Sequence, residues 1–211
     1  MTLLLNQMPT RKALSEVAHD FHGRGWMAGT AGNLSARSAS RPDCFWITAS
    51  GLPKGQLEPS DLILVDSESD EVMQRFKDSA KPSAEVAIHR CIYGLFPEAR
   101  ACFHVHTVEA CLAAGRVSAD ADSLPLPALE MLKGLGLWDQ KPQASLALFD
   151  NLLDVPQIAA QIQQRFQAQP PQIPALMIRD HGVTVWGASL QQAYNRIEIV
   201  EFLMSYLARR P

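Results

Sequence analysis

Charge of one sign, long apolar runs and paired cysteines are all scarce in this 211-residue sequence. Lys and Arg number 19 against 22 Asp and Glu, a net charge of −3, so electrostatics does not favour nucleic acid or an anionic membrane as a partner. No stretch approaches the roughly 18 apolar residues of a membrane span, and the first ten residues have no basic run typical of a secretory signal. We therefore expect a cytoplasmic protein that binds neither nucleic acid nor membrane.

Four cysteines do not make a disulfide framework in a chain of this length, and the absence of a Cys-X-X-Cys pair argues against a cysteine zinc site. Apolar residues nevertheless make up 47% of the chain, enough for a hydrophobic core. At roughly 100–200 residues per domain, we expect one domain over residues 1–211.

Apolar periodicity predicts helices and strands along most of the chain. Residues 115–145, with prolines at 125, 127 and 142, fit neither period. Short turns join the early strands, as in antiparallel hairpins, whereas helices alternate with the later strands. We therefore predict an α/β protein with a largely antiparallel sheet and helices on its faces. The predicted helices cover 10–22, 83–96, 108–114, 156–167 and 189–209, and the predicted strands cover 34–37, 44–49, 62–65, 100–106, 175–178 and 183–186.

The sharpest motif is His104-Val105-His106 in a strand-like run. Side chains alternate across a strand, so His104 and His106 share one face while Phe103 and Val105 point into the core. Such a pair can bind one metal ion, although two surface histidines are the alternative. His181, between two apolar strands, offers a third nitrogen, and three histidines suit a catalytic zinc with an open position or another divalent ion. The remaining histidines are expected to be structural: His19, His22 and His89.

Three loops of small polar residues could bind phosphate. Residues 29–35 combine glycines, whose backbone N–H groups can surround an anion, with the donors Thr30, Asn33 and Ser35. Residues 48–51 and 81–85 are similar, and the latter precede a predicted helix, where backbone amides favour an anion. Each loop alone could be a plain turn. Together with the three histidines, they indicate a small phosphorylated substrate.

Two carboxylates are candidates for proton transfer. Glu85 falls in the first turn of the helix predicted over 83–96, where it could simply complement the helix dipole. Glu130 is flanked by leucine and methionine, and apolar surroundings would raise its pKa and keep it protonated near neutral pH. The alternative for Glu130 is an ion pair with Lys133.

Five motifs, in this order, resemble the class II aldolase and adducin-head family: GTAGNLS, ITASG, KPSAE, HVH and DHG, between residues 29 and 182. The resemblance implies a three-layer α/β/α sandwich around a largely antiparallel sheet, assembled as a homotetramer. It implies one zinc ion per subunit, held by His104, His106 and His181. Ala84 replaces a serine frequent in the family, which puts one phosphate contact in doubt. The implied phosphate-binding residues are Thr30, Asn33, Ser50, Gly51 and Ser83.

Within the family, the segments WITASGLPKGQL, LEMLKGLG and RDHGVTVWG resemble dehydratases of methionine salvage. This implies zinc-dependent loss of water from a small phosphorylated ketose with a methylthio tail. Glu130 is then the catalytic acid/base, whereas Glu85 corresponds to the proton-transfer group of the aldolases. Because both are present, an aldolase or 4-epimerase stays open, as does a non-enzymatic adducin-head-like binding module. We expect Glu130 to be the essential acid and Glu85 to contribute less.

Overall fold

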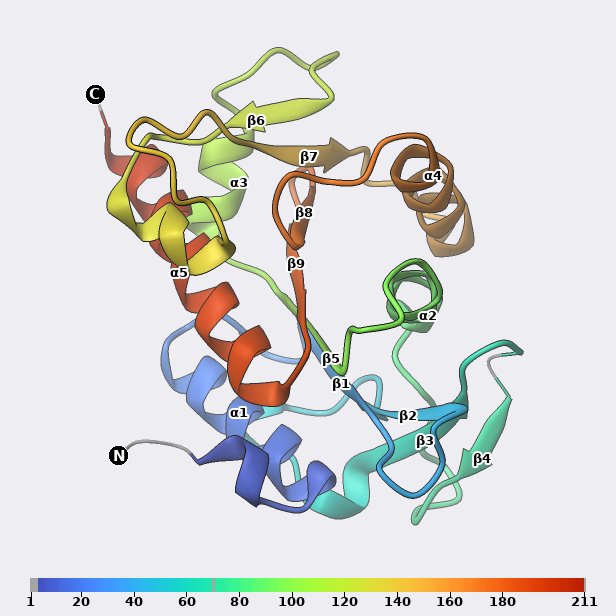
Figure 1. Ribbon diagram of the computed structural model, residues 1–211. Helices are drawn as coiled ribbons and strands as arrows, with labels where there is room; N and C mark the ends of the chain where they lie inside the picture. The colour runs from blue at the N-terminus through green and yellow to red at the C-terminus, as the bar shows by residue number, and fades with distance from the viewer. Residues whose placement is uncertain (1–3, 70, 211) are drawn as a thin grey trace.

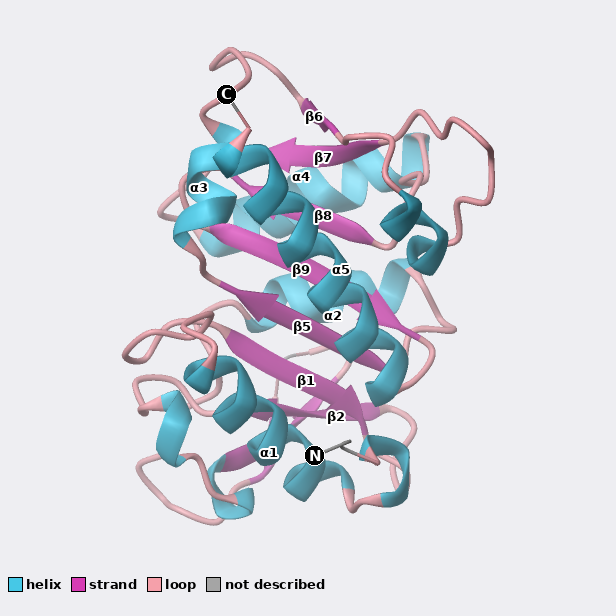
Figure 2. Ribbon diagram, turned by 90° about the vertical axis from the view of Figure 1, so that its left-hand side faces the viewer, coloured by secondary structure: helices cyan, strands magenta, loops and turns pink. Residues whose placement is uncertain are grey.

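A nine-stranded sheet runs through the centre of the computed structural model, which describes residues 4–69 and 71–210. The strand order is β4-β3-β2-β1-β5-β9-β8-β7-β6 (Figures 1 and 2). Neighbouring strands are antiparallel except β7 and β8. The strands are β1 (Asn33–Arg37), β2 (Cys44–Thr48), β3 (Leu62–Asp66), β4 (Val72–Gln74), β5 (Ala101–Val105), β6 (Ser123–Pro125), β7 (Ser145–Phe149), β8 (Ala175–Ile178) and β9 (Gly182–Gly187).

Helices cover both faces of this sheet. Figure 1 shows the sheet edge-on, with α1 (Thr10–Gly23), α3 (Val108–Ala114) and α5 (Leu190–Arg209) on one side. The other side carries α2 (Val86–Leu95) and α4 (Val155–Ala168). The three-layer α/β/α sandwich with a largely antiparallel central sheet is therefore confirmed. Four short 3₁₀ helices complete the described elements: η1 (Leu5–Gln7), η2 (Lys54–Gln56), η3 (Pro59–Asp61) and η4 (Glu130–Leu135).

The middle strands are buried on both faces, which gives apolar runs in place of a polar–apolar alternation. In β5, Phe103 and Val105 belong to the core under α1, α3 and α5, while Cys102 belongs to the core under α2 and α4. All three side chains are fully buried. A buried Phe or Val stabilises the fold by about 1.5–3 kcal/mol, so the strand that carries the histidine motif is held firmly from both sides.

The 20-residue helix α5 shows the predicted apolar stripe. Ala193, Ile197 and Met204 are fully buried in the core, while Glu198 and Arg209 lie on the outer surface. Among the described residues, no helix is both long and apolar enough to cross a membrane.

The structure departs from the predicted elements in two places. Helix α2 begins at Val86 and not at residue 83, because residues 81–83 run extended beside the end of β2: Ser50 N donates to the Lys81 carbonyl at 2.9 Å, and Ala49 forms a bridge with Pro82. The short strands β4, β6 and β7 occupy segments in which no strand was predicted. β4 and β6 are edge strands of three residues each, too short to show an alternation.

Candidate active site

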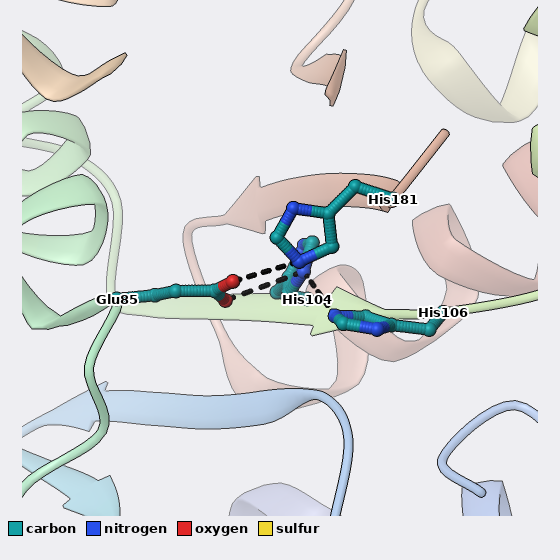
Figure 3. Close-up of side chains that lie close together, drawn as sticks. All are labelled: Glu85, His104, His106 and His181. Carbon is teal, nitrogen blue, oxygen red and sulfur yellow. Dashed lines mark hydrogen bonds and ion pairs between the residues drawn. The ribbon is translucent and has the colours of Figure 1, made fainter. Parts of the chain in front are cut away.

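The three histidines predicted as metal ligands converge at the end of β5 (Figure 3). His104 lies within β5, His106 follows its last residue, and His181 precedes the neighbouring strand β9. His104 Nε2 and His106 Nε2 are 2.8 Å apart. The ring centroid of His181 lies 5.0 Å from that of His104 and 4.3 Å from that of His106. Both histidines of the HVH motif thus point to the same side, as strand alternation predicts.

The third histidine, His181, lies in the turn between β8 and β9. Asp180 adopts a left-handed backbone conformation with φ 52°. Gly182 has no room for a side chain, because a Cβ there would overlap the carbonyl oxygen of Val105. β9 can therefore run against β5 directly after His181, which places the imidazole over the end of β5.

The hydrogen bonds of His104 decide which of its nitrogens is free. Its Nδ1 lies 3.0 Å from the carbonyl oxygen of Val183, which can only accept, so Nδ1 carries the hydrogen. Burial lowers the pKa of His104 and keeps the ring neutral, which leaves a lone pair on Nε2 directed into the cluster. Burial, together with His104 and His181, lowers the pKa of His106 to about 3. Neutral imidazoles with an orienting backbone partner are typical metal ligands.

Glu85 faces the three histidines from the start of α2 (Figure 3). Its Oε1 lies 2.8 Å from His181 Nε2, its Oε2 lies 3.3 Å from His104 Nε2, and Asn33 Nδ2 donates to Oε2 at 2.6 Å. Burial alone would raise the pKa of Glu85, but His104, His181 and Asn33 outweigh it and hold the pKa well below its usual range. A carboxylate therefore sits 9% exposed beside the histidines.

This donor set fits a divalent metal ion. The ligand atoms of Glu85, His104, His106 and His181 all lie within 4.8 Å of one another. A tetrahedral zinc with bonds of about 2.0–2.2 Å places its ligand atoms roughly 3.3 Å apart, close to the separations found here. Three imidazole nitrogens and a carboxylate oxygen suit zinc, and iron or manganese share this preference.

The residues implied as phosphate ligands come from three loops that the structure joins. Lys54 Nζ donates to the Thr30 carbonyl at 2.7 Å and to the Leu52 carbonyl at 3.2 Å, which ties residues 29–32 to residues 51–54. The 48–51 loop contacts 81–83 through Ser50. Thr30, Ser50 and Gly51 are exposed, and Ser83 is buried.

Asn33 differs from the exposed Thr30, Ser50 and Gly51 because its amide nitrogen and its oxygen each already have a partner in the protein. It pairs in register with His104, donates to Glu85, and accepts at Oδ1 from His89 Nε2 at 2.5 Å. Its position therefore serves Glu85, and its role toward a phosphate stays a prediction.

Glu130 lies in surroundings that differ from those predicted. It opens the 3₁₀ helix η4, its side chain is 84% exposed, and its carboxylate pairs with Lys133 at 3.0 Å. The apolar surroundings expected from the sequence are wrong for this chain, and the alternative ion pair is confirmed. Leu132 and Leu135, three residues apart, turn into the core, which leaves Glu130 on the outer side of the turn. The cluster of Glu85 and the three histidines does not include Glu130.

Two buried polar residues behind the site have a larger part than the sequence suggested. His89, expected to be structural only, is fully buried and contacts Asn33; its position one helical turn after Glu85 could have indicated a shared face. Lys54 is 1% exposed. No sequence pattern indicates that a lysine there would be buried.

Comparisons with known proteins show the family of this chain. Residues 12–207 match the model of the class II aldolase and adducin N-terminal domain family. A methylthioribulose-1-phosphate dehydratase from Microcystis aeruginosa is 51% identical over 93% of this chain and 94% of its own length. One from Leptospira biflexa is 40% identical over 93% and 95%. The crystal structure of YgbL from Escherichia coli superposes with a TM-score of 0.77 at 25% identity, covering 96% of this chain and 91% of that one. The chain belongs to the class II aldolase and adducin N-terminal domain family.

Proposed function

We propose that the chain dehydrates 5-methylthioribulose 1-phosphate to the 2,3-diketo-5-methylthiopentyl 1-phosphate, a step of methionine salvage, in the cytoplasm. The observation that carries the proposal is the cluster of His104, His106, His181 and Glu85, in a chain 51% identical to a protein named for this activity. The four cysteines are free thiols, which suits a reducing compartment.

One zinc ion per subunit, bound by His104, His106 and His181, would supply Lewis-acid polarisation of the substrate's carbonyl and hydroxyl oxygens. Glu85 lies beside these ligands, and its low pKa makes it a poor proton donor at neutral pH. Its carboxylate is therefore assigned to accept the proton that leaves C3. The C4 hydroxyl departs as water after protonation by a separate acid. General acid–base assistance of this kind contributes about 10²–10⁴-fold in rate.

The phosphate of the substrate is assigned to the joined loops. Backbone amides of the glycine-rich turns and the side chains of Thr30, Ser50 and Ser83 can donate to it, and Gly51 has φ +72°, open to a close ligand. Asn33 lies between this region and Glu85. A phosphorylated ketose would then extend from the loops toward the histidines.

Glu130 remains the proposed acid through assembly into a homotetramer. Its carboxylate is exposed and, within the described part of its own chain, pairs only with Lys133, so in the proposed assembly it would reach the histidine cluster of another copy. Next to it, Met131 borders a groove of about 1070 Å³ along α5, where Phe202 is 48% and Tyr206 is 40% exposed. Exposed aromatic side chains around a large groove are typical of protein–protein contacts.

Mixed oligomers test this sharing of the site. Glu130→Gln and His106→Ala should each be inactive alone. Co-expressed in equal amounts, they should regain about one quarter of wild-type activity, because half of the intact histidine sites then meet a partner with an intact Glu130. No recovery in mixed oligomers of verified composition would place the acid within one chain.

An aldolase is the second candidate, favoured by one observation: Glu85, and not Glu130, lies in the cluster. Such an enzyme would cleave the C3–C4 bond of a ketose 1-phosphate and release an aldehyde. The deciding experiment incubates the zinc-loaded protein with 5-methylthioribulose 1-phosphate and follows the products by mass spectrometry. Loss of 18 mass units with formation of the diketone supports dehydration, whereas two shorter carbonyl fragments support cleavage. A chain that binds zinc and gives neither product contradicts both.

A further inference from the structure

A chain of buried hydrogen bonds runs from the core under α2 to the Glu85 carboxylate. Asn33 Nδ2 is 2.6 Å from Glu85 Oε2, and Asn33 Oδ1 is 2.5 Å from His89 Nε2. His89 Nδ1 is 2.6 Å from Ser35 Oγ, which is 2.8 Å from the Tyr93 hydroxyl. All five side chains are at most 9% exposed.

Chemistry leaves only one direction for these hydrogen bonds. A carboxylate can only accept, so Asn33 must turn its NH₂ group to Glu85 and its carbonyl oxygen to His89. A carbonyl oxygen also only accepts, so His89 carries its hydrogen on Nε2. Burial, with His104 adding to it, lowers the pKa of His89 to about 3, so the ring is neutral and Nδ1 has a lone pair.

The remaining two donors follow from that lone pair. Ser35 gives its single hydrogen to His89 Nδ1 at 2.6 Å in preference to the Cys102 carbonyl at 3.5 Å, and Tyr93 then donates to Ser35. Every donor therefore points toward Glu85. Hydrogen bonds that run in one direction polarise one another, and the low dielectric of the core strengthens them.

We propose that Ser35 and His89 are positioning residues that orient the Asn33 amide and hold the Glu85 carboxylate toward the three histidines. The assignment of a reaction to Glu85 rests on the proposed function, but the hydrogen-bond direction does not. The chain orients and does not conduct protons, because the amide of Asn33 cannot relay one and Tyr93 at the other end is 1% exposed.

Removing the Ser35 hydroxyl would change the site through His89 and Asn33. Without it, the lone pair on His89 Nδ1 is buried without a donor. The hydrogen stays on Nε2, because the Glu85 carboxylate still holds the Asn33 oxygen toward His89. The ring has lost the partner that fixes its other side, so it holds the Asn33 amide less firmly against Glu85.

The first test reads the hydrogen position directly. In zinc-loaded protein labelled with ¹⁵N-histidine, long-range ¹H–¹⁵N spectra should show a neutral His89 with its hydrogen on Nε2 from pH 5 to 8. The resonance is assigned by its absence in His89→Gln. A hydrogen on Nδ1, or protonation within this range, would overturn the proposal even if the enzyme is fully active, and the result stands even if the proposed substrate is wrong.

The second test separates positioning from folding. Ser35→Ala should leave the hydrogen of His89 on Nε2 and lower kcat about three- to tenfold, the worth of one hydrogen bond, with KM nearly unchanged. His89→Phe should lose more, whereas His89→Gln, which keeps one donor and one acceptor, should recover most of kcat. The matched control is Ser38→Ala, because Ser38 is a 4% exposed serine after the same strand whose hydroxyl bonds to Ser40 and Arg41. An unchanged kcat in folded Ser35→Ala, or no recovery of kcat in His89→Gln relative to His89→Phe, would contradict the role.

Discussion

The start of α2 and the 3₁₀ helix η4 carry the same functional group into opposite surroundings. The side chain of Glu85 is 12% exposed and contacts Asn33, His104 and His181, whereas the side chain of Glu130 is 84% exposed and pairs with Lys133. The first carboxylate is oriented by the interior of its own chain. The second is oriented by one ion pair, which at a surface is worth about 0–1 kcal/mol. A sequence motif around a carboxylate therefore does not say whether the same chain completes its site.

The largest effect is expected from removing one of the three histidines that Glu85 faces. His104→Ala, His106→Ala and His181→Ala should each remove most of the bound zinc and lower activity more than about 10³-fold, because no ligand replaces the lost imidazole. Metal analysis of the purified variants measures the first effect and dehydration assays the second. His19→Ala, on the exposed side of α1, is the control and should keep both. Full zinc content after a double exchange of His104 and His106 would show that the metal binds elsewhere.

The next effect compares the two carboxylates directly. Glu130→Gln should lower kcat/KM by about 10²–10⁴-fold with zinc content and fold unchanged, because it removes the proton donor. Glu85→Gln should lower it less, and Glu71→Gln, at an exposed glutamate beside β4, should have no effect. Near-normal activity of Glu130→Gln together with an inactive Glu85→Gln would reverse the two roles and favour the aldolase arrangement.

A smaller effect separates Ser50 and Ser83, two of the implied phosphate ligands, from Asn33, which also bonds to Glu85. Ser50→Ala and Ser83→Ala should raise KM for the phosphorylated ketose by about 10–100-fold, the worth of a hydrogen bond to a charged group. Asn33→Ala should lower kcat as well, because it also removes the bond to Glu85. Steady-state kinetics with methylthioribulose 1-phosphate and with its dephosphorylated analogue measure these changes. Equal turnover of the two substrates by the wild type would give the loops another purpose.

The last prediction concerns stability and a third carboxylate, Glu201 on α5. It is buried like Glu85, but none of the groups that shift its pKa is a cation. Burial and the charge of Glu109 raise its pKa to about 8, although Thr107 opposes the shift. An unfolded glutamate has a pKa of about 4.3. Between these values the unfolded chain loses a proton that the native chain keeps, so the free energy of unfolding falls as pH rises, by up to about 1.4 kcal/mol per pH unit.

Thermal unfolding from pH 5 to 9 checks this. Glu201→Gln removes the penalty, so its Tm relative to wild type should increase from pH 5 to 8 and then level off. Glu198→Gln, on the outer face of the same helix, should show a difference that does not depend on pH. A Tm difference for Glu201→Gln that is constant with pH would mean that Glu201 ionises at an ordinary pKa.

Local chemistry made much of the site predictable. The HVH motif forced two imidazoles onto one side of β5, and small polar residues marked the loops that lie beside it. Apolar periodicity likewise indicated α1, α3, α4 and α5 nearly to their ends. The edge strands β4 and β6 were not predicted, because three residues are too few to show an alternation. Helix α2 begins later than predicted because the preceding segment pairs with the end of β2.

By itself, the sequence determined that His104 and His106 share one side, because side chains alternate along a single strand. The sandwich followed from the resemblance to the family, and the pairing of β5 with β9 brings His181 to the other two histidines. Only the tertiary structure decided the surroundings of each carboxylate. Glu85 became buried because β1 brings Asn33 beside His104 and α2 packs His89 against it. Glu130 stayed at the surface because its leucine neighbours take the buried side of η4. Burial and charge at such positions depend on elements distant in the chain, and no local pattern encodes them.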